Sequence, residues 1–301
     1  MEQRGSQVVL GVDPDPAALW PAPVREGGDE DKDLAAALGA GAHAVLDHCR
    51  ALIGATAEAC VAVKLQLASF EALGAAGRAV LDAVAAHARG AGLLVIADGK
   101  RGDIDVSARA YASALFGGLD SPLGRFEGLG ADGATVNPLM GRDAIEPFIA
   151  AARREGAGVF LLVRTSNPGA ADVEDLALAA GGAVWERLAA LVAELGEEGI
   201  GEAGLSDVGA VIGATAPAHL RRARELMPGA VFLLPGIGAQ GGAVEDLEPA
   251  FLPGAAGGLI TASRSIAGAH QLHGGSPAQA ARAEAERLRA AAWTLSQRAA
   301  A

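Results

Sequence analysis

Eight short apolar runs, separated by longer alanine-rich segments, constrain the fold of this chain more than any other feature. Each run spans five or six residues, and runs that are apolar almost throughout are typical of parallel strands buried on both faces. The predicted strands are Val8–Asp13, Val61–Gln66, Leu93–Asp98, Gly133–Asn137, Val159–Arg164, Val208–Gly213, Val231–Pro235 and Gly258–Ala262.

The segments between these strands have helical length and composition. Two long loops are predicted as well, a polar one at 14–32 and a second at 117–130. The C-terminal segment Ser276–Ala301 is predicted to be one amphipathic helix that begins at Ser276-Pro277 and buries Leu288 and Trp293. The other predicted helices are Asp33–Ala59, Phe70–Arg89, Asp143–Arg154, Glu174–Leu195 and Ala216–Leu226.

The order of these elements predicts an α/β fold, a (β/α)8 TIM barrel that forms a single domain over residues 1–301. Eight strand-then-helix units in about 270 residues match the size of this barrel. A doubly wound open sheet is the alternative, but no Gly-x-Gly-x-x-Gly turn follows the first strand. In such a barrel the functional residues lie at the carboxyl ends of the strands and in the loops that follow.

Net charge and cysteine content exclude several classes of function. The formal net charge of −12 argues against binding to nucleic acid or to an anionic membrane, because both repel an acidic protein. A small anion could still bind, but only in a locally basic pocket. Cys49 and Cys60 are too few for a disulfide framework, and the N-terminus has no apolar signal region. We therefore expect reduced thiols and a cytoplasmic location.

Residues 97–104, Ala-Asp-Gly-Lys-Arg-Gly-Asp-Ile, place Asp98, Lys100 and Asp103 at the end of the third strand. Side chains alternate along a strand, so Asp98 and Lys100 point to the same side, while Asp103 lies past the strand end. Lys64 interrupts the second strand, where an isolated ammonium would be costly to bury, and Asp98 on the neighbouring strand is its natural partner. We expect a network of alternating charge in which each member keeps the others ionised.

The loops after the last two strands have the composition of a phosphate site. The glycines of Pro235–Gly242 let successive backbone N–H groups converge on an anion, and a helix beginning near Val244 would add its positive end. Arg264 follows the eighth strand and can hold phosphate oxygens through two N–H groups. These two loops would supply the basic pocket that an acidic protein needs.

The histidines do not predict a metal site. All six fall on helix patterns or in the C-terminal loop, and none stands at a strand end or in a cluster with cysteine. Metal-centred and histidine-based catalysis therefore have little support in the sequence.

In chain order, these motifs resemble those of the orotidine 5′-phosphate decarboxylase family. The resemblance covers Val8 to Ile266, and the Lys-Arg-Gly-Asp-Ile segment, the long loops and the length are similar to the longer bacterial (type 2) subgroup. The central match is Asp98-x-Lys100-x-x-Asp103-Ile104, and the others are Leu10-Gly11-Val12-Asp13-Pro14, Lys64, Thr165-Ser166-Asn167-Pro168-Gly169, Gly238-Ala239-Gln240-Gly241-Gly242 and Ser263-Arg264-Ser265-Ile266.

The resemblance implies decarboxylation of orotidine 5′-phosphate to UMP in de novo pyrimidine synthesis, with no cofactor and no metal. Lys100 would protonate C6 of the pyrimidine as carbon dioxide leaves, and Asp98 would lie against the substrate carboxylate. Lys64 would bridge Asp98 and the ribose hydroxyls. The remaining substrate contacts would come from Asp13 to the ribose, Ser166 to the base, and Gln240 and Arg264 to the 5′-phosphate.

The resemblance also implies a homodimer with shared active sites. Asp103 would be contributed to the neighbouring subunit's site, and Ser107 would reach the partner's ribose. Two positions depart from the family pattern. Gly99 stands where alanine is expected and points away from the site, and Ser107 stands where threonine is usual, which keeps the hydroxyl and loses a methyl group.

Two other functions remain open at this point. A metal-dependent hexulose-phosphate synthase, an aldolase of the same superfamily, shares the Asp-x-Lys-x-x-Asp strand but would need an acidic metal ligand where Lys64 stands. A non-catalytic nucleotide-binding barrel would keep the phosphate site alone and would have no reason to retain Lys100 between two acids.

Overall fold

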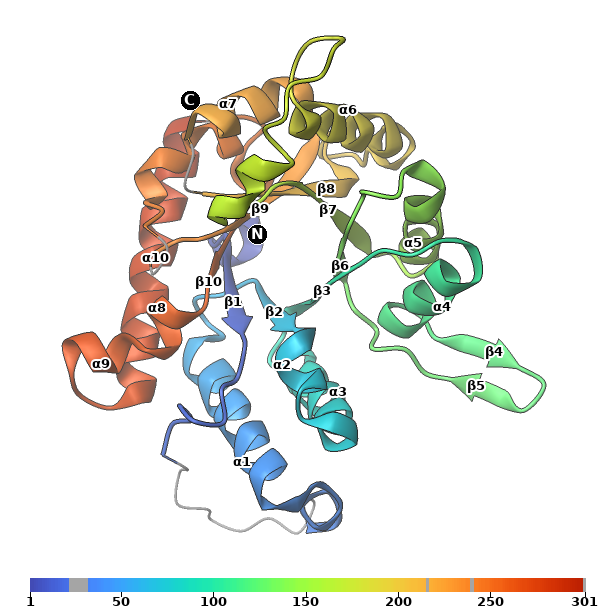
Figure 1. Cartoon of the computed structure of the whole chain (residues 1–301). Helices are drawn as coiled ribbons and strands as arrows, with labels where there is room; N and C mark the ends of the chain where they lie inside the picture. The colour runs from blue at the N-terminus through green and yellow to red at the C-terminus, as the bar shows by residue number, and fades with distance from the viewer. Residues whose placement is uncertain (22–31, 215–216, 239–240, 300–301) are drawn as a thin grey trace.

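The computed structural model describes residues 1–21, 32–214, 217–238 and 241–299, without the side chains of 32–37 and 217. Eight parallel strands close into a barrel that is surrounded by helices (Figure 1). The strands pair in the order β1-β10-β9-β8-β7-β6-β3-β2, so every strand of the barrel lies beside the one that precedes it in the chain. The predicted TIM barrel is confirmed.

All eight predicted strands are present in the barrel. Seven have both ends within two residues of the prediction, and only β3 differs more, because it continues through the charged segment to Arg101. The strands are β1 (Val8–Val12), β2 (Ala62–Gln66), β3 (Leu94–Arg101), β6 (Gly133–Val136), β7 (Gly158–Arg164), β8 (Ser206–Ile212), β9 (Ala230–Pro235) and β10 (Gly258–Ala262).

The long helices follow the sequence prediction with two corrections. The helix predicted at Phe70–Arg89 is two helices, because Gly74 at a φ of 66° interrupts the chain between α2 and α3. The helix predicted at Glu174–Leu195 is wrong in its first half, where Gly181 and Gly182 both have positive φ. The helices are α1 (Lys32–Thr56), α2 (Leu67–Glu71), α3 (Gly74–Gly90), α4 (Asp105–Leu115), α5 (Arg142–Arg154), α6 (Val184–Gly196), α7 (Pro217–Leu226), α8 (Arg264–Ala267), α9 (Ala269–His273) and α10 (Pro277–Ala299).

Shorter elements occupy the connections. The predicted loop at 117–130 holds a hairpin of β4 (Leu119–Ser121) and β5 (Gly124–Phe126), which projects from the barrel (Figure 1). Of the predicted loop at 14–32, residues 14–21 are irregular and 22–31 lie outside the described residues. Five 3-10 helices complete the described chain: η1 (Glu2–Arg4), η3 (Pro168–Asp172), η4 (Glu197–Gly199), η5 (Val244–Phe251) and η6 (Ala255–Gly257).

The two faces of the strands bury separate apolar clusters, as alternation along a strand requires. The larger cluster lies between the barrel and its helices and includes Leu10 and Leu65. The smaller cluster consists of alternate residues such as Val9, Ile96 and Leu233. It fills the barrel interior, because Leu233 also lines the pocket described below. This apolar filling leaves only the carboxyl ends of the strands for polar chemistry.

The cysteines are buried in the layer between helix and strand. Cys49 on α1 and Cys60 before β2 are fully buried and free. Burial raises the pKa of each thiol to about 12, which makes both unreactive. Among the described residues, no helix is both long and apolar enough to cross a membrane.

Candidate functional site

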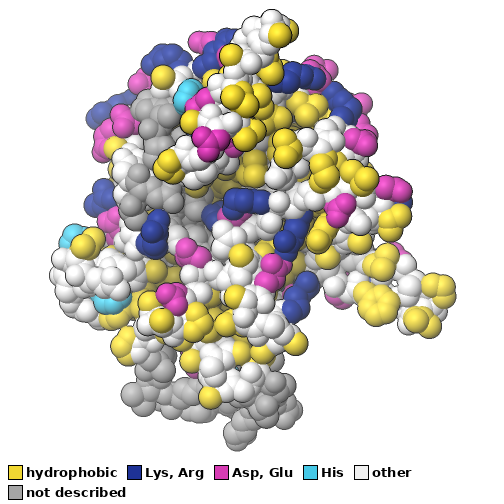
Figure 2. All heavy atoms as spheres, viewed as in Figure 1, with side chains coloured by type: hydrophobic (Ala, Val, Ile, Leu, Met, Phe, Trp, Pro, Cys, Tyr) yellow, Lys and Arg dark blue, Asp and Glu magenta, His cyan; other side chains and the backbone are white. Residues whose placement is uncertain are grey.

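A polar pocket of about 500 Å³ opens at the carboxyl ends of the barrel strands. Figure 2 looks onto this face, where basic and acidic side chains gather around the middle of the molecule. Charged and hydroxyl side chains line the pocket, in contrast to the apolar interior below it. The charged residues that line it are Asp13, Lys64, Asp98, Lys100, Glu174 and Arg264.

Asp98 is the centre of the charged network. Its side chain is only 5% exposed, and each carboxylate oxygen accepts from one ammonium and one neutral donor. Oδ1 accepts from Lys100 Nζ at 2.7 Å and from Thr135 Oγ1 at 2.8 Å. Oδ2 accepts from Lys64 Nζ and, at 3.4 Å, from Gln66 Nε2. The buried carboxylate is therefore fully satisfied, as its burial requires.

The two ammonium groups determine the charge of this carboxylate. Burial by itself raises the pKa of Asp98, but the nearby charges of Lys64 and Lys100 outweigh it, so the pKa is held below its ordinary value. Lys64 is nearly buried, whereas the Lys100 side chain is 44% exposed and faces the pocket. Both ammonium groups line the pocket, and Lys100 is the more exposed of the two.

The backbone that carries Lys100 departs from a regular strand. Between β3 and β6, Ala97 pairs with Ala134 and Arg101 with Val136, so three residues of β3 lie opposite Thr135 alone. Lys100 has a φ of 47°, a left-handed conformation that is uncommon for a side chain of its size. Bulges and left-handed residues of this kind concentrate at functional sites, where they redirect side chains.

Gly99 points away from the pocket, as the sequence predicts. A Cβ at this position would lie 2.7 Å from Cδ1 of Leu67 at the start of α2. A larger residue would therefore require Leu67 to shift. Gly99 lets the bulged part of β3 approach this helix closely.

The phosphate-type loops lie at the opposite side of the pocket. Gly236 and Ile237 follow β9 and line it together with Arg264, which begins α8. Gly236 and Gly238 both have positive φ, and a Cβ on Gly238 would lie 2.9 Å from Cβ of Ser265. The predicted helix near Val244 is the 3-10 helix η5. The glycines thus bring the two loops into contact, as a backbone anion site requires.

The loop after β7 is held by an acidic residue. Glu174 accepts from the backbone N–H of Thr165 at 2.8 Å and from its hydroxyl at 2.9 Å. The adjacent Asp175 pairs with Arg164 through two hydrogen bonds of 2.8 and 2.9 Å. Ser166 lies within this braced loop and lines the pocket. This bracing replaces the helix that was predicted to begin at Glu174.

Most of the predicted site residues meet in the pocket. Asp13, Lys64, Asp98, Lys100, Ser166 and Arg264 all line it, and the Ser263 hydroxyl donates to Asp13. Asp103 and Ser107 do not line it. Asp103 lies past the end of β3, where its Oδ1 accepts from the N–H of Ile104, and Ser107 is exposed on α4. Gln240 lies outside the described residues.

The sequence prediction missed three residues of the pocket: Gln66, Thr135 and Glu174. A signal exists for Gln66, because it lies two residues after Lys64 on the same strand face. Thr135 lies two residues before Asn137, the predicted end of this strand, and Asn137 does not line the pocket. Glu174 was assigned to a helix, so its contact with the preceding loop could not be foreseen.

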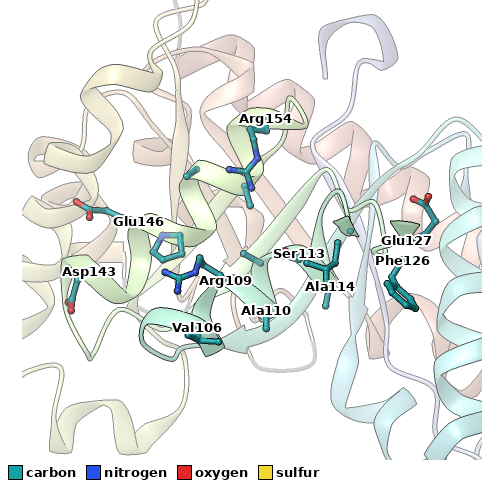
Figure 3. A pocket seen from close by; sticks show the side chains of 16 residues that line it. Val106, Arg109, Ala110, Ser113, Ala114, Phe126, Glu127, Asp143, Glu146 and Arg154 are labelled. Atoms are coloured by element: carbon teal, nitrogen blue, oxygen red, sulfur yellow. The ribbon is translucent and has the colours of Figure 1, made fainter. Parts of the chain in front are cut away.

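A larger cavity of about 850 Å³ lies elsewhere, between α4, α5 and the β4–β5 hairpin (Figure 3). Its lining is mostly apolar and shares no residue with the polar pocket. Its charged side chains, among them Arg109, Glu146 and Arg154, do not converge on one point (Figure 3). Among the described residues, no group of three or more His, Cys, Asp or Glu side chains could hold a metal ion.

Comparison with known proteins shows to which family the chain belongs. The sequence profile of the Orotidine 5'-phosphate decarboxylase / HUMPS family matches residues 7–283. Orotidine 5'-phosphate decarboxylase of Rhodopirellula baltica is 41% identical over 270 residues, covering 89% of this chain and 86% of its own length. The protein of the same name from Deinococcus radiodurans is 45% identical over 241 residues, covering 80% of this chain and 83% of its own.

Solved structures agree in fold. The structure of Leishmania donovani OMP decarboxylase superposes with a TM-score of 0.71 at 29% identity, covering 97% of this chain and 96% of that one. The profile match spans the whole barrel, from the residue before β1 into α10, and includes every charged residue of the pocket. The chain is therefore an enzyme of the orotidine 5'-phosphate decarboxylase / HUMPS family.

Proposed function

We propose that this protein decarboxylates orotidine 5′-phosphate to UMP without a cofactor, as a step of pyrimidine biosynthesis. The observation that carries the proposal is the buried carboxylate of Asp98 between the ammonium groups of Lys64 and Lys100. Across the same pocket lie Arg264 and the glycine loop after β9. A nucleotide with a reacting carboxylate at one end and a phosphate at the other fits this distribution of charge.

Lys100 is the proton donor in this proposal. Loss of carbon dioxide leaves an electron pair on C6 of the pyrimidine, which the ring cannot delocalise well. The ammonium of Lys100 faces the pocket and can stabilise that charge and then transfer a proton to C6. The products are carbon dioxide and UMP, and the neutral amine of Lys100 regains its proton from solvent.

Asp98 has two effects in this proposal: it repels the carboxylate of the bound substrate, and it orients the two lysines. An ionised Asp98 and a substrate carboxylate about 4 Å apart would repel by roughly 4 kcal/mol at an effective dielectric constant near 20. Decarboxylation relieves this repulsion. Asp98 also holds the Lys64 and Lys100 ammonium groups in place, so the positive charge is oriented before the reaction begins.

The remaining contacts position the substrate. Arg264 and Gln240 hold the 5′-phosphate, Asp13 and Lys64 bind the ribose, and Ser166 contacts the base. Binding at the phosphate, far from the reacting carbon, supplies energy that orients the pyrimidine against Lys100. The positions of Asp13, Ser166 and Arg264 around one pocket support this part of the proposal.

The active enzyme is proposed to be a homodimer in which Asp103 and Ser107 complete the neighbouring subunit's site. Both residues lie outside their own pocket, so a contribution within one chain is not supported. Ile104 and Val106 beside them are exposed apolar side chains, and so is Leu139 in the turn after β6. Exposed apolar groups around a polar residue are typical of a protein–protein interface.

We also propose a cytoplasmic location for this protein. The buried free thiols of Cys49 and Cys60 are compatible with a reducing compartment.

Substitution of Lys100 by alanine tests the proposal directly. We expect Lys100→Ala to abolish decarboxylation, followed as loss of orotidylate absorbance, while UMP still binds in calorimetry. Arg78→Ala is the matched control, because it removes an exposed cation on α3 that, within the described part of the chain, pairs only with Asp82. It should keep full activity. Normal turnover by Lys100→Ala would refute the assigned role.

The same assay separates the decarboxylase from a metal-dependent aldolase. Activity of the purified protein should be unaffected by a chelator, because Lys64 occupies the place where that aldolase needs an acidic ligand and would repel a divalent cation. Loss of activity with chelator and recovery with a divalent metal would favour the aldolase. Binding of UMP without any turnover of orotidine 5′-phosphate by the wild-type protein would favour a nucleotide-binding module.

A further inference from the structure

Thr135 is a polar residue of the pocket for which the proposed mechanism has no task. It lies on β6, is only 1% exposed and faces the network around Asp98. Its neighbours along the strand, Ala134 and Val136, are apolar and fully buried. A hydroxyl at this depth is costly unless both its proton and its lone pairs find partners.

The hydroxyl of Thr135 has one possible orientation. Asp98 is ionised and can only accept, so the Thr135 proton must point to Oδ1, at 2.8 Å. The backbone N–H of Lys100 can only donate, so it uses a lone pair of the same oxygen, at 2.9 Å. The Thr135 hydroxyl thus joins the Asp98 carboxylate to the backbone of Lys100. The ammonium of Lys100 binds the same carboxylate.

The bulge in β3 explains why a side chain is needed here. Three residues of β3 lie opposite Thr135 alone, so the N–H of Lys100 falls outside the regular ladder of backbone hydrogen bonds. Thr135 Oγ1 takes the place of the missing carbonyl. Valine has the same shape and suits a strand, but it would leave the N–H of Lys100 without this partner.

Lys100 needs such support more than a regular strand residue does. Its φ of 47° is an unfavourable conformation for a residue other than glycine, and it persists only where the surroundings enforce it. The side chain is also 44% exposed, so packing alone does not fix the ammonium.

We propose that Thr135 is the positioning residue of the site, whose hydroxyl holds the left-handed Lys100 and Asp98 in a single geometry. The inference rests on the proposed function, because it assigns Lys100 the proton transfer. It adds to that function a residue that touches neither the reacting carbon nor the phosphate and acts through Lys100 and Asp98.

Three variants separate the hydroxyl from shape and from folding. Thr135→Val removes the hydroxyl and keeps the volume, and Thr135→Ser keeps the hydroxyl. Thr56→Val is the matched control, because Thr56 is equally buried but lies on α1, where its hydroxyl donates to the carbonyl of Leu52. Urea unfolding of each variant establishes that the measured protein is folded.

We expect Thr135→Val to lower kcat by about tenfold to a hundredfold, the usual loss when a hydrogen bond to a charged group is removed. KM for orotidine 5′-phosphate and the affinity for UMP should change by less than about threefold, because Thr135 does not hold the nucleotide. Thr135→Ser should regain kcat to within about threefold of the wild type. The control Thr56→Val should have the kcat of the wild type.

The pH profile gives a readout that a purely structural role would not move. Without the Thr135 donor the pKa of Asp98 rises, so the acid limb of kcat should move to higher pH in Thr135→Val and remain in place in Thr135→Ser. A kcat of Thr135→Val within twofold of the wild type, a change confined to KM, or an equal loss in Thr135→Ser would overturn the inference.

Failure of the proposed function looks different from failure of the inference. A wild-type protein that leaves orotidine 5′-phosphate unchanged refutes the function whatever the variants do. Whether Thr135 stabilises the network is then tested by a pH titration, in which the 13C carboxyl resonance of Asp98 reports the pKa of this group. A higher pKa in Thr135→Val than in the wild type supports this stabilisation, and an unchanged titration overturns it.

Discussion

Asp98 is the residue on which the electrostatics of the pocket depend. Its carboxylate is buried, yet its pKa is held below the ordinary value by the charges of Lys64 and Lys100. An isolated carboxylate at that depth would instead become neutral. Asp98, Lys64 and Lys100 remain charged at the barrel mouth because they stabilise one another. Removing any one of them changes the pKa values of the other two.

This coupling predicts an acid dependence of stability. A carboxyl group whose pKa is lowered by folding contributes stability that is fully present above its unfolded pKa of about 3.9 and is lost as pH falls through the folded value. We expect Asp98→Asn to lower the free energy of unfolding at pH 7 by about 2 kcal/mol, below the 3–5 kcal/mol of fully buried pairs because Lys100 is half exposed. The difference from the wild type should shrink below about pH 4.

Urea denaturation at a series of pH values measures this effect. Asp82→Asn is a suitable control, because Asp82 pairs with Arg78 on the surface of α3 and should change stability little at any pH. A difference between wild type and Asp98→Asn that stays constant down to pH 3 would contradict the lowered pKa.

The sequence reveals charged residues of the site more readily than neutral ones. Lys64 stands out because it interrupts an apolar strand, where a charge must be paired, and Asp98 because it ends an apolar strand with Lys100 and Asp103 close behind it. Thr135 gives no such signal, since threonine is common in strands and its neighbours are ordinary core residues. Its role depends on the β3 bulge, which brings the N–H of Lys100 to its hydroxyl and cannot be read from strand periodicity.

At the scale of elements, periodicity predicts the strands better than their connections. The barrel strands are recognisable because both of their faces are buried, which makes each run continuously apolar. The segment 174–183 has helical composition, but Gly181 and Gly182 adopt left-handed conformations and Glu174 binds back to Thr165. The β4–β5 hairpin escapes prediction because its strands have three residues each and mostly exposed side chains.

Arg224 shows how one side chain can join several elements. It is 5% exposed and stacks 3.7 Å above the ring of Phe232. Burial lowers the pKa of its guanidinium, but hydrogen bonds to carbonyl oxygens favour its charged form. Its carbonyl partners link α7, β9, η5 and η6, and they belong to Met227, Pro228, Ala230, Pro249, Ala250 and Gly257.

We expect Arg224→Met to lower the free energy of unfolding by about 3–5 kcal/mol, because it leaves several buried carbonyl groups without a donor. Arg224→Lys should recover only part of this loss, since an ammonium has three donors and cannot replace the planar guanidinium. Urea unfolding measures both values. The activity per folded molecule should be unchanged, because Arg224 does not line the pocket, and a destabilisation below about 1 kcal/mol would show that the carbonyls find other partners.

At the scale of the whole molecule, two predicted site residues do not line the pocket of their own chain. Asp103 and Ser107 lie beside exposed apolar residues rather than in the pocket. The family resemblance suggests this division, and the position of Asp103 past the predicted strand end is compatible with it. In the proposed homodimer the surface that they meet belongs to a second chain, which sequence periodicity does not describe.

Mixing two inactive variants tests the shared site. In a twofold symmetric dimer, Lys100→Ala damages its own pocket and Asp103→Ala damages the partner's. Random exchange makes half of the dimers hybrid, and each hybrid retains one intact pocket of two, so we expect about a quarter of the wild-type activity. Each variant alone should be nearly inactive, and an exchanged mixture that recovers nothing would place Asp103 in its own chain's site.

The two buried cysteines have a consequence for the whole barrel. Cys49 lies on α1 and Cys60 just before β2. Both belong to the apolar layer that packs the helices against the barrel. In the closed molecule neither sulfur meets solvent, and neither loses its proton at neutral pH. An alkylating reagent can therefore mark only those molecules in which the packing around these thiols has opened. The extent of labelling at Cys49 and Cys60 therefore measures how often the molecule opens.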